Sequence, residues 1–476
     1  MQSYNQKDTI SAISTPIGEG AISIVRLSGK DAISIADTIF SKDIQNLKSK
    51  TAALGNILDT DKKAVDSAVL IVYRAPNSFT GEDIVEIQCH GGRLITQKVF
   101  EITLLAGARA SLAGEFTMRA FLNKKIDLTQ AEAIQDLISA KNSLAMKAAK
   151  NQLEGHLSKK IKEFQKKIVE IVAFIEANLD FPEEDLQDAS KNTLVENLSQ
   201  ISKDIQKLVD TFEDGKVLKE GLSLCIVGAV NVGKSSLMNA ILKKDRAIVT
   251  NISGTTRDVL KEDLKLNEML YQLIDTAGIR KASNVIEKEG IKRSKKELKD
   301  ADITLLVLDS SRKLNEEDRQ IFEKLDSKKT IAIWNKIDLL EPKVIEPTVV
   351  EPTVVEPKSL DSKVETKEKI DFENVVKISA KKREGLTALY SMIEKLTFKS
   401  KISTNEIIIT QKRHKIALID SLKYLDKAIN DLKNDISHEF IAVDLKSSLL
   451  ELSKIIGFDI TEDILTSIFS NFCIGK

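Results

Sequence analysis

The sequence is short of cysteine, carries no excess charge and has no long apolar run. Its three cysteines, Cys89, Cys225 and Cys473, are too far apart for a zinc motif or a disulfide framework, which suits a reducing cytoplasm. Lysine plus arginine equals aspartate plus glutamate, at 71 each, so no dominant basic face is expected, although local basic patches and an RNA substrate remain open. No apolar run approaches the ~20 residues of a membrane span, and the N-terminus has no targeting signal. We expect a cytoplasmic protein with no membrane partner.

The 476 residues predict a multidomain chain with both α+β and α/β parts. Short β-like runs separated by glycine and proline predict an α+β domain over 1–123. Apolar residues at helical spacing then predict long helices, one beginning at Leu153. Strands and helices alternate over 219–398, so we interpret this segment as an α/β domain inserted into a helical domain built from 124–218 and 399–476. Helical segments that flank the insert without packing together would give the same pattern.

A five-residue repeat interrupts the inserted domain. Glu-Pro pairs begin at 341, 346, 351 and 356, and a charged stretch follows to Lys369. Recurrent proline prevents a helix or a central strand, and there is little apolar surface to bury. We predict that 341–369 is a disordered surface insertion without catalytic content.

A phosphate-binding motif joins a predicted strand, 222–228, to a predicted helix that begins at Ser236. The segment GAVNVGKS, 228–235, fits the pattern GxxxxGK[ST], in which backbone N–H groups surround the phosphates. Lys234 would pair with the β- and γ-phosphates, and the Ser235 hydroxyl would bind Mg²⁺. A chance match in a glycine turn is the alternative.

Two later motifs would face the γ-phosphate and the metal ion. The segment LIDTAG, 273–278, closes a predicted strand, so that Asp275 can hold Mg²⁺ through water and Gly278 can contact the γ-phosphate. The segment GTTRD, 254–258, occupies the expected position of the first switch, where we choose Thr256 over Thr255 as the Mg²⁺ ligand.

Two further motifs predict that the base is guanine. In IWNKID, 333–338, Asp338 can accept hydrogen bonds from the guanine N1–H and 2-amino groups, Asn335 can brace the phosphate loop and Lys336 can cover the base. The second motif is SAK, 379–381, in which the Ala380 N–H could donate to guanine O6. The phosphate loop, DTAG (275–278), NKID (335–338) and SAK (379–381), in this order, predict a Ras-like P-loop domain. The predicted GTP-binding residues are Asn231, Val232, Gly233, Lys234, Ser235, Ser236, Thr250, Asn251, Ile252, Ser253, Gly254, Thr255, Thr256, Asp275, Thr276, Ala277, Gly278, Asn335, Lys336, Asp338, Ser379, Ala380 and Lys381.

Hydrolysis would need an unusual water-positioning arrangement. Ile279 stands where Ras-type GTPases carry a glutamine, so other groups must place the attacking water. Asn231 offers a side-chain carbonyl and the segment 250–255 offers backbone oxygens, a set that suits a monovalent cation. Bracing of the loop is the alternative role for Asn231. Glu287 lies in a charged segment, where a solvated acid at a helix start is the simpler interpretation.

Motifs along almost the whole chain resemble those of the MnmE (TrmE) family of tRNA-modification GTPases. They are TPIG (15–18), IVRLSG (24–29), NSFTGED (77–83), CHGG (89–92), GEFT (114–117), RAFLN (119–123), DLTQAEA (127–133), LDFPEED (179–185) and the closing CIGK (473–476). The chain departs from the usual family pattern at Val230 and Ala113, where proline is common, and at Gln88, where histidine is common. None of these changes removes a named ligand.

The resemblance implies a homodimer formed through an N-terminal domain similar to folate-binding domains. This domain would hold a 5-formyltetrahydrofolate-type one-carbon donor. The folate contacts implied by position are Arg26, Glu86, Lys125 and Lys476. Arginine and lysine can pair with the glutamate carboxylates of folate, and glutamate can accept hydrogen bonds from the pterin. Without the resemblance these residues would be interpreted as ordinary surface or capping charges.

The resemblance also implies potassium-dependent GTPase activity on dimerisation of the nucleotide domains. The implied ligands are Asn231, Thr250, Ile252 and Thr255 for K⁺, and Ser235 and Thr256 for Mg²⁺. Glu287 matches the acid that orients the hydrolytic water. Cys473, in a mobile C-terminal tail, is similar to a residue needed for modification, and a buried structural thiol is the equal alternative.

The implied process adds an aminomethyl or carboxymethylaminomethyl-type group to C5 of the wobble uridine of certain tRNAs, together with the FAD-dependent partner MnmG (GidA). Two other interpretations remain. A ribosome-assembly GTPase acting on rRNA would need a basic RNA-binding domain after the nucleotide domain, whereas this tail is charge-balanced. A folate-dependent one-carbon transferase with a regulatory GTPase would bind folate without needing GTP for product formation.

Overall fold

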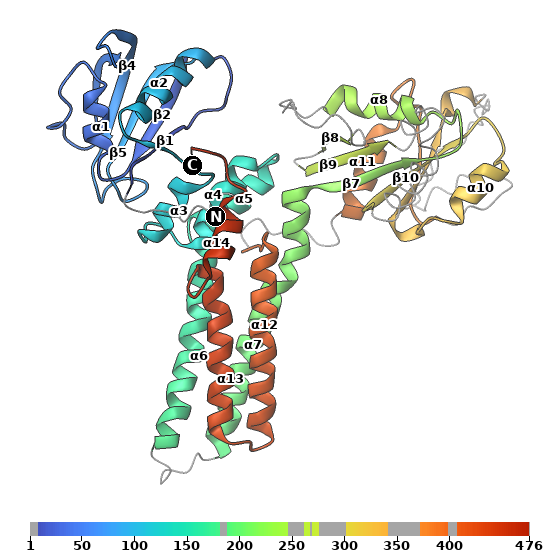
Figure 1. Ribbon diagram of the computed structural model, residues 1–476. Helices are drawn as coiled ribbons and strands as arrows, with labels where there is room; N and C mark the ends of the chain where they lie inside the picture. The colour runs from blue at the N-terminus through green and yellow to red at the C-terminus, as the bar shows by residue number, and fades with distance from the viewer. Residues whose placement is uncertain are drawn as a thin grey trace, which may run out of the picture. The chain divides into compact units, whose positions relative to one another are not determined.

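The computed structural model describes residues 8–180, 188–245, 261–266, 269–275, 301–340, 372–397 and 407–475 (Figure 1). The chain divides into two compact units. The first consists of Met1–Ala140, Met146–Phe212 and Ile407–Lys476, and the second of Lys141–Ala145 and Glu213–Glu406. None of the helices among the described residues combines the length and the apolar character needed to cross a membrane.

A six-stranded sheet forms the N-terminal part of the first unit. Its strands run in the order β3-β4-β5-β2-β1-β6, and every pairing is antiparallel except that of β1 with β6. The strands are β1 (Ile10–Ile13), β2 (Ile22–Ser28), β3 (Thr51–Leu58), β4 (Ala64–Tyr73), β5 (Ile84–His90) and β6 (Arg109–Ala110). Along β4, Ala68, Leu70 and Val72 are buried at every second position, as expected for a strand with one covered face. Helices α1 (Ala32–Thr38) and α2 (Arg93–Leu105) share this core.

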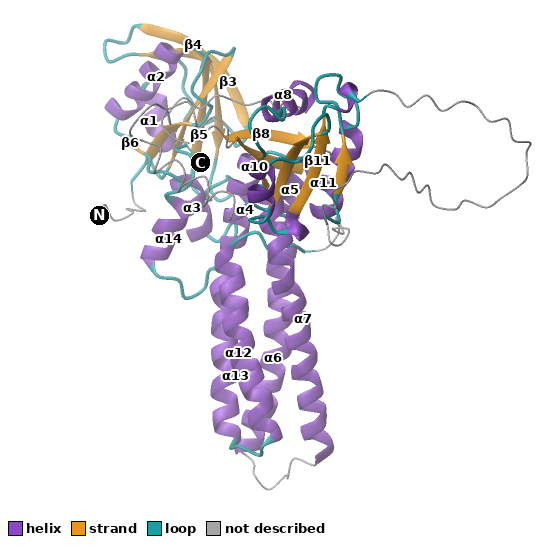
Figure 2. Ribbon diagram, turned by 90° about the vertical axis from the view of Figure 1, so that its right-hand side faces the viewer, coloured by secondary structure: helices purple, strands orange, loops and turns teal. Residues whose placement is uncertain are grey.

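Helices on both sides of the inserted segment pack into one core. Leu157, Ile161 and Phe164 of α6 lie in the same buried cluster as Leu418 and Leu425 of α12. Figure 2 shows α6, α12, α13 and the first part of α7 running side by side. The helices of this unit are α3 (Glu115–Leu122), α4 (Leu128–Ser139), α5 (Ser143–Leu153), α6 (His156–Asp180), α7 (Asp188–Glu220), α12 (Lys412–Lys433), α13 (His438–Ile456) and α14 (Glu462–Phe469), of which α5 and α7 continue into the second unit. The alternative in which the flanking helices do not meet is therefore wrong.

The prediction of one helix beginning at Leu153 is also wrong. Leu153 ends α5, and α6 begins at His156. Gly155 lies between them with a φ of +82°, a left-handed conformation that glycine adopts without strain and that ends a helix.

The second unit contains a mostly parallel sheet. Its strand order is β12-β11-β10-β7-β9-β8, and only β8 is antiparallel to its neighbour. The strands are β7 (Leu222–Val227), β8 (Lys261–Leu266), β9 (Met269–Asp275), β10 (Ile303–Asp309), β11 (Thr330–Asn335) and β12 (Val375–Lys377), and the helices are α8 (Lys234–Asp245), α10 (Glu316–Phe322) and α11 (Leu386–Thr397). All of β10 is buried, as expected for a parallel strand covered on both faces. The carboxyl ends of the five parallel strands share one edge, where α/β sheets bind ligands.

Candidate functional site

The phosphate loop joins β7 directly to α8. Three of its residues, Gly228, Asn231 and Gly233, have positive φ angles of +151°, +64° and +100°. The Lys234 Nζ donates to the carbonyl oxygens of Gly228 at 2.9 Å and Ala229 at 2.6 Å, so the ammonium lies over the loop. This arrangement places a positive charge and a helix N-terminus on the same side of the loop, which suits a phosphate group.

Asn335, the last residue of β11, connects two loops of the site. Its Nδ2 donates to the Val232 carbonyl in the phosphate loop at 3.0 Å. Its Oδ1 accepts from the Ala380 backbone N–H at 2.9 Å. Asn335 is 2% exposed, so neither bond is replaced by bulk water. One buried amide therefore fixes the phosphate loop relative to the loop that follows β12.

Asp338 and Ser379 form the side of the site predicted to bind the base. The Ser379 Oγ donates to the Asp338 Oδ1 at 2.6 Å, and the same Oγ accepts from the Lys382 N–H at 3.1 Å. The hydrogen bond from Ser379 lowers the pKa of Asp338, so the carboxylate form is favoured. An ionised carboxylate with a free oxygen can accept the two N–H groups that guanine presents and adenine lacks. Lys381 follows Ala380 and is exposed.

Asp309 is a site residue that the sequence analysis missed. It ends β10, beside Asn335 on β11, and its Oδ2 accepts from the Lys336 Nζ at 2.6 Å. Burial would raise the pKa of Asp309, but hydrogen bonds from Lys336 and Ser311 outweigh it and lower that pKa. Lys336 has a φ of +64° and is held by this ion pair. Asp309 ends a buried strand, and that position is the signal in the sequence that could have identified it.

One hydroxyl predicted to bind Mg²⁺ lies in the described first turn of α8. Ser235 is exposed in the first turn of α8, and Asp275 ends β9, paired in register with Ile226 of β7. Hydroxyl and carboxylate oxygens are the ligands that Mg²⁺ prefers. Asn231 is exposed and carries an amide oxygen suited to K⁺. Val232 lies in the same phosphate loop, and Ser236 lies in the first turn of α8. No cluster of three or more His, Cys, Asp or Glu side chains suited to a metal occurs in the described part of the chain.

Part of the predicted site lies outside the described residues. These positions are Thr250, Asn251, Ile252, Ser253, Gly254, Thr255, Thr256, Thr276, Ala277, Gly278 and Glu287, together with the repeat at 341–369 and the terminal Lys476.

Two of the residues implied to bind folate touch each other. Arg26 and Glu86 lie opposite each other on β2 and β5, and the Arg26 Nη2 donates to the Glu86 Oε1 at 2.7 Å. The Tyr73 hydroxyl donates to the other Glu86 oxygen at 3.4 Å. The Lys125 Nζ donates instead to the Pro76 carbonyl at 2.9 Å. Because folate is elongated, Arg26 cannot hold its glutamate tail while Glu86 holds the pterin, so that division of roles does not fit.

The C-terminal tail is attached to the N-terminal part of its unit. Ala113 and Ile474 form a β-bridge, the Gly114 N–H donates to the Cys473 carbonyl at 3.4 Å, and the Ser14 hydroxyl donates to the Gly475 carbonyl at 3.1 Å. The Cys473 side chain itself is exposed. The alternative of a buried structural thiol is therefore wrong. Backbone bonds hold the tail while leaving the sulfur accessible.

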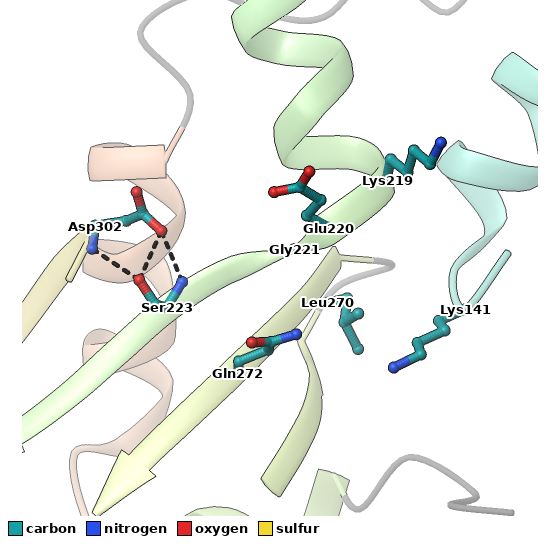
Figure 3. Close-up of a pocket in the computed structure, with 8 residues that line it drawn as sticks. All are labelled: Lys141, Lys219, Glu220, Gly221, Ser223, Leu270, Gln272 and Asp302. Atoms are coloured by element: carbon teal, nitrogen blue, oxygen red, sulfur yellow. Dashed lines mark hydrogen bonds between the residues drawn. The ribbon is translucent and has the colours of Figure 1, made fainter. Parts of the chain in front are cut away.

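A cavity of about 460 Å³ lies at the opposite edge of the second sheet, where β7 and β9 begin (Figure 3). There the Ser223 N–H and hydroxyl both donate to the Asp302 carboxylate, at 2.8 and 2.7 Å. The carboxyl edge, not this one, holds the described residues of the motifs predicted to bind GTP, among them Lys234, Asn335 and Asp338.

Comparisons with known proteins give one consistent family. The family model for the MnmE helical domain matches residues 128–473, and that for the GTP-binding protein TrmE N-terminus matches residues 9–125. A tRNA modification GTPase MnmE of Protochlamydia amoebophila is 47% identical over 476 residues, covering 100% of this chain and 99% of that relative. A second, from Clostridioides difficile, is 44% identical and covers 98% of this chain and 99% of its own length. Among solved structures, Aquifex aeolicus Era bound to GDP·AlF4⁻ is 24% identical and covers 43% of this chain and 66% of that one, with a TM-score of only 0.28.

The two curated relatives extend over both units, and their identity is high enough to establish common family membership. The matched segments include the N-terminal sheet, the helices and the nucleotide motifs at the carboxyl edge of the second sheet. The chain therefore belongs to the MnmE family of tRNA modification GTPases.

Proposed function

We propose that this chain binds and hydrolyses GTP at the carboxyl edge of the second sheet, as one component of tRNA wobble-uridine modification. The observation that carries this proposal is the double hydrogen bond of Asn335, to Val232 and from Ala380. It joins the loop suited to phosphate with the loop suited to the base. Asp338, held ionised by Ser379, supplies the preference for guanine.

Residues of the phosphate loop and of the segments that follow it would bind the phosphates and the two metal ions and orient the attacking water. Lys234 would pair with the β- and γ-phosphates, and Ser235, with Thr256, would hold Mg²⁺, which neutralises charge on the phosphate oxygens. Asn231, with Thr250, Ile252 and Thr255, would hold K⁺, which supplies positive charge where other GTPases use an arginine finger. Glu287 would orient the attacking water, because Ile279 has no polar atom to do so.

The first unit would supply the one-carbon group and the dimer contact. Arg26 and Glu86, with Lys125 and Lys476, would bind a 5-formyltetrahydrofolate-type donor, and two chains would associate through this domain. With the FAD-dependent partner MnmG (GidA), the homodimer would add an aminomethyl or carboxymethylaminomethyl-type group to C5 of the wobble uridine in the cytoplasm. The exposed thiol of Cys473 supports a role for this residue in the modification step.

The deciding experiment is GTP hydrolysis by the full chain in matched KCl and NaCl buffers, for the wild type and Asn231→Ala. Stimulation by K⁺ that is lost in Asn231→Ala is the expected result. A matched Ser310→Ala variant, altered outside the phosphate loop, should keep the stimulation. Equal rates in both salts would remove the cation from the mechanism and favour a ribosome-assembly GTPase.

A further inference from the structure

A groove of about 480 Å³ lies in the first unit, between the beginning of α6 and the first turn of α4. Three lysines of α6, Lys159, Lys162 and Lys166, line it. All three are exposed, and their spacing of three and four residues puts them on one stripe of the helix. The opposite face of α6, including Leu157 and Ile161, is buried in the helical core. The three lysines therefore form an exposed basic stripe along one side of the groove.

The lysines of this stripe have few acidic partners. Within the described ranges, Lys159 and Lys162 form no ion pair, and the Lys166 Nζ lies 4.0 Å from the Glu170 Oε1, at the limit of an ion pair. Other lysines of the same helix differ, since Lys160 pairs with Glu163 at 3.4 Å and stacks over Phe164. The positive charge in the groove is thus available to a ligand.

Two acids also line the groove, but they face three lysines, so the lining keeps a net positive charge. Asp127 is the N-cap of α4, and its Oδ1 accepts from the Gln130 N–H at 3.0 Å and the Thr129 hydroxyl at 2.7 Å. Glu163 is paired with Lys160, which lies outside the groove. Each acid therefore has at least one partner within the protein.

We infer that this groove binds backbone phosphates of the tRNA substrate. Three ammonium groups that follow one another at about one helical turn form a row over roughly 10 Å, a length that spans successive phosphates of one strand. Lysine contacts phosphates as a point charge without reading the bases, so the groove would position tRNA without selecting its sequence. A neutral chain needs such a local row to bind RNA, because its overall charge provides no attraction. This inference rests on the proposed function, which supplies tRNA as the substrate.

The test compares two triple variants of the full chain. Lys159→Gln, Lys162→Gln and Lys166→Gln remove the row. Lys167→Gln, Lys203→Gln and Lys433→Gln remove the same charge from exposed positions of the same unit outside the groove. Binding of a fluorescent tRNA transcript with a wobble uridine is measured by anisotropy between about 50 and 300 mM KCl. We expect the groove variant to bind about tenfold more weakly at the lowest salt, and its log–log salt slope to fall by about 2. The control variant should stay within about twofold of the wild type.

Further measurements separate the possible failures. Thermal unfolding and basal GTP hydrolysis should be unchanged in both variants, because the lysines are exposed and belong to a different unit from the nucleotide motifs. If the wild-type protein binds no tRNA, the groove assignment fails together with the tRNA part of the proposed function, whereas wild-type binding that the groove variant retains overturns the groove assignment alone. Equal loss in both triple variants would overturn the groove assignment, as would unchanged tRNA binding in the groove variant. Titration with inorganic phosphate identifies a small-anion site if it saturates at micromolar concentration while tRNA binding is unaffected, and this result would also overturn it.

Discussion

The Asn335 Nδ2 donates to the Val232 carbonyl across 3.0 Å, which ties the end of β11 to the middle of the phosphate loop. The same amide accepts from the Ala380 N–H, so a single side chain holds the phosphate and base sides together. Both bonds are buried, and neither backbone partner has an alternative in water.

Asn335→Ala should therefore weaken nucleotide binding more than an ordinary loop substitution. Leaving two buried backbone groups without partners costs about 1–3 kcal/mol each, and a loss near the lower end, about 2.7 kcal/mol in total, corresponds to roughly 100-fold lower affinity for GDP. Fluorescence titration with a labelled GDP measures this loss. Asn434→Ala, an exposed amide in the other unit, is the control and should have no effect. Wild-type affinity in Asn335→Ala would show that the loops are fixed by other contacts.

Ser379→Ala should move the pH dependence of GDP binding. The hydrogen bond from Ser379 lowers the pKa of Asp338, and guanine binding requires the carboxylate form. Binding is therefore present above this pKa and is lost as the pH falls through it. Without the hydroxyl the pKa rises, so the acidic limb of the binding curve should shift to higher pH while affinity at pH 8 changes little. An unshifted limb would mean that the titrating group is not Asp338. Circular dichroism at each pH checks that the domain remains folded.

Sequence reasoning predicted that the phosphate loop, Asp275, Asn335 and Ser379 share one edge of a sheet, because each of these motifs is continuous and ends or follows a strand. The segment LSLCIV became β7, and Asp275, Asn335 and Ser379 follow or end strands of one sheet. The Lys336–Asp309 ion pair could not be predicted in this way, because Asp309 ends β10, Lys336 follows β11, and Asp309 belongs to no motif. Lys336 was predicted only to cover the base.

Contacts between helices that are far apart in the sequence could not be predicted either. Glu132 of α4 and Arg413 of α12 are 281 positions apart, yet the Arg413 Nε donates to the Glu132 Oε1 at 3.1 Å. Helical periodicity identified which face of each helix is buried. It carries no information about which charged residue would be buried with a partner, since that depends on how the helices pack.

Glu132→Gln should destabilise the helical part of the first unit. Burial would raise the pKa of Glu132, but His414 and Arg413 outweigh it and lower that pKa to about 2. The His414 Nε2 lies 2.8 Å from the carboxylate and is fully buried. Removing one partner of such a pair leaves the others uncompensated, which costs about 3 kcal/mol in the free energy of unfolding at pH 7.

The destabilisation caused by Glu132→Gln should decrease as the pH falls. Because the folded pKa of Glu132 is below its ordinary value of 4.5, the stabilisation is complete above pH 4.5 and is lost as the pH falls towards 2. The difference between wild type and Glu132→Gln should thus shrink by about half at pH 3, measured by urea unfolding followed by far-ultraviolet circular dichroism. Glu163→Gln, which removes an exposed acid, should change stability by less than about 0.5 kcal/mol. A difference that does not vary with pH would argue against the buried ion pair as its source.

Gly233→Ala tests whether the phosphate loop and Asn335 act as one unit. A Cβ at Gly233 would lie 2.2 Å from the Asn335 Nδ2, and the glycine φ of +100° is strained for any other residue. We expect the single variant to lose GDP affinity by about 100-fold or more, from both causes. In an Asn335→Ala background the clash is absent, so the added loss should be about tenfold smaller than in the wild type. Gly18→Ala, where a Cβ meets nothing within 4 Å, is the control. Additive losses in the double variant would show that Gly233 is required only for its backbone conformation.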